Sequence, residues 1–66
     1  MKVLLRNPRR EIEVAGPRSV NRLLDDLQLS REAHLVICNG TLVPGDAVLN
    51  EEDRIEVRPV ISGGAT

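Results

Sequence analysis

The side chains in this sequence that could do chemistry are few, and their spacing is not that of a catalytic or metal site. Cys38 is the single thiol and His34 the single imidazole, and neither has a nucleophile–base partner at motif spacing. Cys38 alternates inward with Val36, where a thiol packs as a small hydrophobe, while His34 is predicted to be solvated in a polar connection. The acidic groups at 25–26 and 51–53 lack a metal-loop pattern. We therefore predict no catalytic residue, no metal and no bound cofactor, and a protein that is not an enzyme.

One further feature with chemical potential is the Gly63-Gly64 dipeptide, which precedes Ala65 and Thr66. A backbone without Cβ can approach other atoms closely and adopt any φ. The simplest interpretation of an isolated Gly-Gly is a flexible chain end without a function. Its meaning therefore depends on the domain that it follows.

The residues before this dipeptide predict a small mixed sheet with one helix. Ser19 is a candidate N-cap, and apolar residues at i, i+3, i+4 and i+7 predict a helix over 20–28. Alternating residues predict a hairpin of strands at 1–6 and 11–14 and a last strand at 54–58. An apolar run with β-branched residues predicts a central strand at 35–39, which ends in an Asn39-Gly40 turn. An extended piece is expected at 41–43, and a loop should pack Val48 and Leu49 onto the core. The first and last strands should lie parallel in the middle of the sheet, with the helix on one face. The sequence predicts an α+β domain over 1–61 and a flexible tail at 62–66.

Composition narrows the function classes. The 66 residues contain no Phe, Tyr or Trp and carry a formal net charge of −1, which argues against base stacking and against attraction to nucleic acid or an anionic membrane. The cluster of Arg6, Arg9 and Arg10 is predicted to be a solvated edge. A single cysteine excludes an internal disulfide and suits a reducing compartment, and no segment approaches the ~20 apolar residues of a membrane span. We expect a cytoplasmic protein with no nucleic-acid and no membrane partner.

Three segments, in their order along the chain, resemble the sulfur carriers of the ThiS/MoaD family, which have the ubiquitin-like β-grasp fold. Val36-Ile37-Cys38-Asn39-Gly40 is similar to the family's apolar strand that ends in Asn-Gly. Residues 51–57 are similar to its Asp-Gly-Asp element and alternating strand, although Glu52 stands where the family has Gly, so a turn requiring φ > 0 is expected to be rearranged. Pro59-Val60-Ile61-Ser62-Gly63-Gly64 is similar to the family's C-terminal tail. The resemblance implies a mixed sheet of four to five strands with one main helix packed on one face.

The resemblance also implies that the reacting group is the carboxylate of Gly64. In the family, an adenylyltransferase similar to ubiquitin-activating enzymes uses ATP and Mg²⁺ to adenylate this carboxylate, and a sulfur donor then displaces AMP to leave a thiocarboxylate. Glycine suits a tail that threads a narrow channel in another enzyme. A sulfur-accepting biosynthetic enzyme is the expected receiving partner, and the alternative is a ubiquitin-like modifier conjugated through Gly64 to target lysines. The segment that precedes Gly64 and is expected to be recognised by these partners is Val60, Ile61, Ser62 and Gly63.

Ala65 and Thr66 depart from the family, whose members usually end at the second glycine. While they remain, the Gly64 carbonyl belongs to an amide and cannot be adenylated as a carboxylate. By similarity to related carrier systems, we predict a precursor that a deubiquitinase-like (JAMM-type) metalloprotease cleaves between Gly64 and Ala65. By the same similarity, a carrier with such an extension is expected to supply sulfur for the biosynthesis of cysteine or of thiocarboxylate siderophores rather than of thiamine or molybdopterin. A harmless extension is the alternative.

The family's fold implies a docking surface for the activating enzyme on the sheet face that the helix leaves uncovered. Arg6 and Arg58 stand where relatives often have apolar side chains, which indicates an acidic partner surface. A passive β-grasp binding module that never uses its tail is a further alternative. By alternation, the uncovered face is predicted to carry Leu4, Arg6, Leu35, Ile37 and Arg58.

Overall fold

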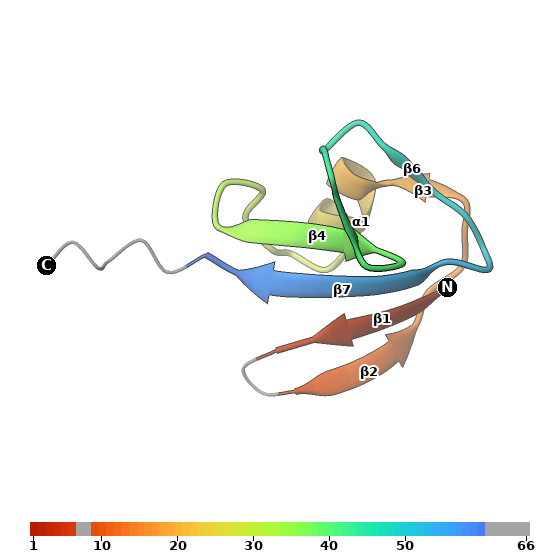
Figure 1. Cartoon of the computed structure of the whole chain (residues 1–66). Helices are drawn as coiled ribbons and strands as arrows, with labels where there is room; N and C mark the ends of the chain where they lie inside the picture. The colour runs from red at the N-terminus through yellow and green to blue at the C-terminus, as the bar shows by residue number, and fades with distance from the viewer. Residues whose placement is uncertain (7–8, 61–66) are drawn as a thin grey trace, which may run out of the picture.

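The computed structural model describes residues 1–6 and 9–60, and Figure 1 shows how they are arranged. Five strands form one sheet in the order β2-β1-β7-β4-β5, and β3 pairs with β6 in a second, two-stranded sheet. Each helix and strand predicted from the sequence is present, with boundaries that differ by at most two residues. The elements are β1 (Lys2–Leu5), β2 (Arg10–Glu13), β3 (Arg18–Ser19), α1 (Val20–Asp26), β4 (His34–Cys38), β5 (Thr41–Val43), β6 (Val48–Leu49) and β7 (Arg54–Pro59).

The first and last strands pair in parallel in the middle of the large sheet, which confirms the predicted arrangement. Val3 of β1 lies opposite Ile55 of β7, while β2 and β4 run antiparallel to β1 and β7 on either side. The tight connection from β4 to β5 is the predicted turn, in which Asn39 and Gly40 have φ values of 52° and 86°. Positive φ at both central residues is what a type I′ hairpin turn requires, so these two residues fix the register of β4 against β5.

Helix α1 begins where the sequence predicts but ends earlier. The backbone N–H of Arg22 donates a hydrogen bond to the Ser19 hydroxyl at 3.1 Å, which confirms Ser19 as the N-cap. The prediction that the helix continues to Gln28 is wrong, because α1 ends at Asp26. The apolar spacing continues beyond the helix, and spacing alone does not show where a helix stops.

The early end of α1 is a left-handed cap at Gln28, whose φ is 61°. The N–H of Gln28 donates to the C=O of Asp25 at 3.0 Å, and the N–H of Leu29 donates to the C=O of Leu24 at 2.9 Å. This pair of bonds is the Schellman pattern, which satisfies carbonyl groups that the last turn of a helix leaves unpaired. Glycine is the usual residue at the left-handed position, and its absence here hides the cap in the sequence.

The core lies between α1 and one face of the five-stranded sheet. Val20, Leu23 and Leu24 of the helix are at most 3% exposed, and they contact the inward-facing residues of the strands. Since a single helix covers a single face, the opposite face of the sheet stays open (Figure 1). The buried residues outside the helix are Met1, Val3, Val36, Leu49, Ile55 and Val57.

The predicted packing of the loop at 48–49 onto the core holds for Leu49 alone. Leu49 is fully buried, whereas Val48 is 63% exposed, because the two residues alternate along β6. Leu49 lies opposite Arg18, and Val48 opposite Ser19, in the pairing of β6 with β3. Strands of two residues are too short to show a periodic pattern, and the sequence analysis did not predict them as strands.

In the turn before β7, Glu52 is not among the described residues with positive φ. The turn is closed by a hydrogen bond from the Asp53 N–H to the Asn50 C=O at 3.0 Å, and the Asp53 carboxylate accepts from the Asn50 N–H at 2.8 Å. The Asp53 side chain therefore stabilises a turn that contains no glycine.

The observed topology is the ubiquitin-like β-grasp fold: a hairpin, a helix packed across one sheet face, and a last strand inserted beside the first. This confirms the predicted fold class. The predicted boundary between domain and tail, at 61–62, lies outside the described residues. Within 1–6 and 9–60, no helix has the length and apolar character to cross a membrane.

Candidate functional site

The end of β7 is the point from which the Gly-Gly segment continues. Beyond Pro59, the N–H of Val60 donates to the C=O of Ala33 at 2.7 Å, so the pairing of β7 with the β4 side extends one residue past the strand. Val60 is 41% exposed and is the last described residue before residues 61–66, which Figure 1 draws in grey. The other residues predicted for tail recognition, reaction and processing lie outside the described residues: Ile61, Ser62, Gly63, Gly64 and Ala65.

The open face of the sheet carries side chains aligned in rows across the strands. In the central row, Glu56 of β7 lies opposite both Leu4 of β1 and Ile37 of β4, and Ile37 in turn lies opposite Leu42 of β5. Directly opposed residues present their side chains on the same face. The same alternation places all five residues predicted for this face together on it: Leu4, Arg6, Leu35, Ile37 and Arg58. Their role as a docking surface remains a prediction.

Glu56 joins the two arginines of this face into one cluster. Its Oε2 accepts hydrogen bonds from Arg58 Nε at 2.7 Å and from Arg6 Nη2 at 3.0 Å. These hydrogen bonds hold the pKa of the Glu56 carboxyl below its usual range, and the one from Arg58 has the larger effect. Two guanidinium groups and one carboxylate leave a net positive charge in the middle of the face, which suits an acidic partner surface. The sequence analysis assigned no role to Glu56.

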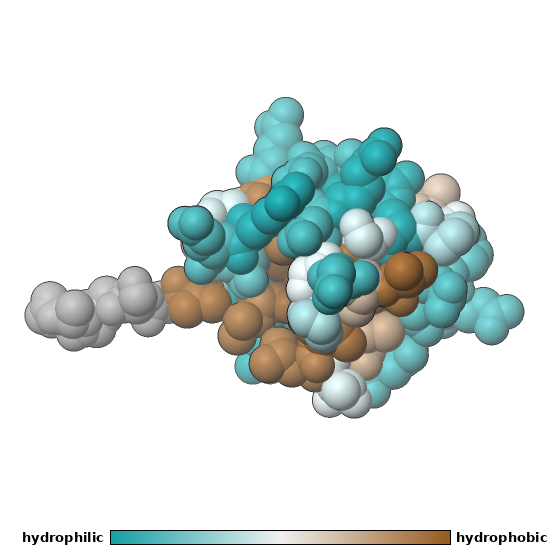
Figure 2. Space-filling view, turned by 90° about the horizontal axis from the view of Figure 1, so that it is seen from above, coloured by the Kyte–Doolittle hydropathy of each residue, from teal (hydrophilic) through white to brown (hydrophobic). Residues whose placement is uncertain are grey.

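The β4–β5 side of the open face is apolar. Leu35 and Leu42 are 46% and 59% exposed, and with Val60 they are three of the four large hydrophobic residues exposed in the described part of the chain. Figure 2 shows hydrophobic surface that begins beside the grey tail and continues along the body of the molecule. Sequence alone missed Leu42, because its face follows from its register with Ile37. Exposed apolar side chains gathered beside a polar cluster are typical of an interaction surface.

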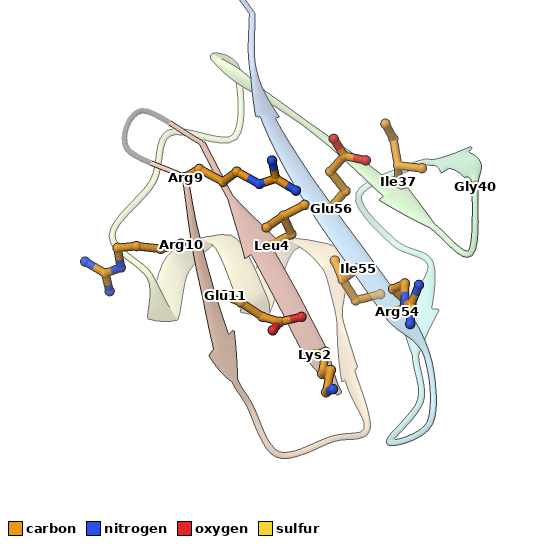
Figure 3. Close-up of a pocket in the computed structure, with 10 residues that line it drawn as sticks. All are labelled: Lys2, Leu4, Arg9, Arg10, Glu11, Ile37, Gly40, Arg54, Ile55 and Glu56. Atoms are coloured by element: carbon orange, nitrogen blue, oxygen red, sulfur yellow. The ribbon is translucent and has the colours of Figure 1, made fainter.

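A shallow depression crosses the same face from β2 and β1 to β7 and β4 (Figure 3). Leu4 and Glu56 lie at its centre, and Lys2 and Glu11 contribute charges of both signs. Arg9 extends toward Glu56 in this view. The open face is thus divided into a charged half and an apolar half, with the Glu56 cluster between them.

Cys38 packs as the sequence predicts. Its side chain is half-buried against the core, and burial, together with a hydrogen bond to Asp53, raises the pKa of the thiol. Asp53 also accepts a hydrogen bond from Asn39 Nδ2 at 3.0 Å. These contacts connect the β4–β5 turn to the turn before β7 and keep the thiol protonated, so the geometry gives Cys38 a structural role.

His34 differs from its prediction as a solvated residue of a polar connection. It is the first residue of β4 and is half-buried. Its Nδ1 lies 2.9 Å from the Ser30 carbonyl, and because a carbonyl oxygen only accepts, Nδ1 carries the hydrogen. Across residues 1–6 and 9–60, no three His, Cys, Asp or Glu side chains gather in a way that would hold a metal ion.

The β-grasp fold and a last strand that leads to a C-terminal Gly-Gly place this chain in the class of small ubiquitin-like carriers. The sequence model of the ThiS family matches residues 3–64, and the chain belongs to the ThiS family. It is 38% identical over 65 residues to the sulfur carrier protein TtuB of Thermus thermophilus, an alignment that covers 97% of this chain and 100% of TtuB. These similarities confirm the family inferred from the sequence.

Proposed function

We propose that this protein is a sulfur carrier whose Gly64 carboxylate is adenylated and then converted to a thiocarboxylate. The observation that carries this proposal is the extent of the family match, which runs from residue 3 to residue 64 and ends at the second glycine. The similarity to a sulfur carrier protein over nearly the whole chain supports it. In this function the chain is a substrate and carrier for other enzymes, and it acts in the cytoplasm.

The chemistry requires activation because a carboxylate is a poor electrophile. Transfer of AMP from ATP onto the Gly64 carboxylate releases pyrophosphate and supplies a leaving group. A sulfur nucleophile then attacks the carbonyl carbon, AMP departs, and the product is a thiocarboxylate that can donate sulfur to an electrophilic acceptor. ATP and Mg²⁺ belong to the activating enzyme, and glycine at 63 and 64 lets the backbone enter its active site.

Docking of the activating enzyme is assigned to the open sheet face. Leu35 and Leu42 offer exposed apolar surface, and the Glu56 cluster presents Arg6 and Arg58 beside it. An apolar area next to guanidinium groups fits a partner with an apolar centre and neighbouring carboxylates. Leu4 and Ile37, both half-buried, complete the face.

Activation also requires that Ala65 and Thr66 be removed. We assign this step to a JAMM-type metalloprotease that hydrolyses the peptide bond between Gly64 and Ala65. The end of the family match at residue 64 supports a boundary at this bond.

The test is the intact mass of the carrier after expression in its own cells. The expected species ends at Gly64 and is heavier than the free acid by the difference between sulfur and oxygen. Gly64→Ala should abolish this species, whereas Thr66→Ala, a matched change in the segment to be removed, should leave it in place. A native carrier that retains Ala65 and Thr66 and shows no sulfur-bearing form would refute the proposal.

The protein-modifier alternative is not favoured, because the matching relative is named a sulfur carrier protein. The two functions predict different products from the same activated Gly64. Blotting a lysate for the carrier should give one band if sulfur transfer is its function. A ladder of covalent adducts that disappears in Gly64→Ala would indicate a modifier.

A further inference from the structure

The basic residues of this chain are almost all arginine. Lys2 is the single lysine among nine basic side chains, and the other eight are arginines. A lysine amine becomes a nucleophile when it loses its proton, whereas the arginine guanidinium stays protonated in proteins and does not. For a chain whose own end becomes an acylating group, this difference has a direct chemical consequence.

Lys2 lies at the end of the sheet that is farthest from the tail. It is opposite Arg54 at the start of β7, and the tail leaves β7 after Pro59. At about 3.3 Å per residue, β7 separates these two levels by roughly 16 Å. The N-terminal ammonium of Met1 lies at the same end as Lys2, 3.5 Å from the Glu13 carboxylate. Both amines are therefore remote from the base of the tail.

The reach of the tail sets which side chains an activated Gly64 can meet. The five residues that follow Pro59, from Val60 to Gly64, span at most about 18 Å when fully extended. Gly64 can approach Lys2 only if the whole segment runs straight back along the sheet. Arg58, in contrast, directly precedes the start of the segment, and the Glu56 cluster holds Arg6 beside it.

The ion pairs of these two arginines do not require a guanidinium group. Arg6 and Arg58 each make one contact to the same carboxylate oxygen of Glu56, which a lysine ammonium could also make. Arg31 shows the contrasting case, because its Nε and Nη2 donate to the two oxygens of Asp25 at 3.1 and 2.5 Å. The choice of arginine at the base of the tail is therefore not explained by forked hydrogen bonding.

We propose that arginine replaces lysine around the base of the tail so that the activated Gly64 is not captured by an amine of its own chain. This inference rests on the proposed carrier function. In the reaction that is avoided, a deprotonated lysine nitrogen attacks the Gly64 carbonyl carbon. The C–O bond to AMP breaks, AMP leaves with the electron pair, and the nitrogen loses a proton to water, which leaves an isopeptide bond and a dead carrier.

The test places an amine at two positions of one strand and measures self-capture. Arg58→Lys and Arg54→Lys add the same side chain to exposed positions on the same face of β7, near the tail and far from it. Lys2→Arg removes the lysine altogether. Each variant is made as residues 1–64 with a C-terminal thioester from intein cleavage, because every contact described for the domain lies within residues 1–60. Thermal unfolding checks that the three variants share the parent fold.

Intact mass distinguishes the outcomes at mildly alkaline pH. Self-capture gives a chain lighter than the hydrolysed acid by one water, and we expect it at least about tenfold faster in Arg58→Lys than in Arg54→Lys, because a short connection raises the effective concentration of the amine. The parent and Lys2→Arg should hydrolyse without self-capture. Equal rates in the two lysine variants, or capture at Lys2 in the parent as fast as in Arg58→Lys, would overturn the inference. No activating enzyme or sulfur donor takes part, so this result is independent of whether Gly64 is adenylated in cells.

Discussion

Truncation of the two exposed leucines of the open face tests whether that face binds the activating enzyme. Leu35 and Leu42 are 46% and 59% exposed, so together they offer roughly the surface of one leucine for burial in a complex. Full burial of a leucine contributes about 1.5–3 kcal/mol. In the double variant Leu35→Ala, Leu42→Ala we expect a loss of about 1.5–2.5 kcal/mol of binding, which weakens the complex roughly 10- to 60-fold.

The assay is ATP–pyrophosphate exchange by the activating enzyme, measured against the concentration of a carrier that ends at Gly64. The KM for the carrier should rise by the expected factor, while the rate at saturation should change little because the reacting end is intact. Val48→Ala is the matched control, since Val48 is 63% exposed but lies on β6. The docking assignment would be refuted by an unchanged KM in the double variant, or by an equal effect of Val48→Ala.

Three further predictions concern the body of the domain and are measured by chemical unfolding. Leu23→Ala removes a side chain that is fully buried, and a loss of about 2–5 kcal/mol should leave a large share of this small domain unfolded at 25 °C. Gly40 and Gln28 both have positive φ, which glycine adopts more readily than other residues. Gly40→Ala should therefore destabilise the domain by about 1 kcal/mol, although open space surrounds the glycine, and Gln28→Gly should stabilise it by a similar amount. Effects of the opposite sign would contradict the observed backbone. The pKa of Asp53 lies below its ordinary value of 3.8, chiefly because its carboxylate accepts a hydrogen bond from the Asn50 N–H. The ionised Asp53 carboxylate should therefore stabilise the folded domain fully above pH 3.8, and this stabilisation should be lost as the pH falls through the lower pKa of the folded state. Asp53→Asn should lack that part of the acid dependence, and identical acid profiles would refute it.

The elements that the sequence predicts correctly are those whose signals are local. Alternation sets the strands, and the spacing of apolar residues with Ser19 before them sets the start of α1. The Asn39-Gly40 pair fixes a turn because both residues tolerate positive φ. The predicted parallel pairing of β1 and β7 is one that a right-handed crossover connection permits.

The features that sequence could not show depend on contacts between distant residues or on an unusual residue in a special conformation. Gln28 ends the helix in a left-handed position where glycine would have signalled the cap. The cluster around Glu56 forms because Arg6, 50 residues earlier in the chain, donates to its carboxylate. Leu42 joins the open face only through its register with Ile37. For Glu56 and Leu42 the missing information is the identity of the partner residue, which alternation along a single strand does not contain.

The position of β7 explains how so small a domain can present its end to another enzyme. β7 is paired on both sides, with β1 and with β4, and its inward residues Ile55 and Val57 are at most 2% exposed. A tail that continued from an edge strand would start from backbone with one neighbour, and edge pairing is the part of a sheet most open to fraying and exchange. Here the hydrogen bond from Val60 to Ala33 extends the pairing to the last described residue. The segment after Val60 therefore continues from a fixed point beside the apolar half of the open face, so a partner that binds this face also sets where that segment enters it.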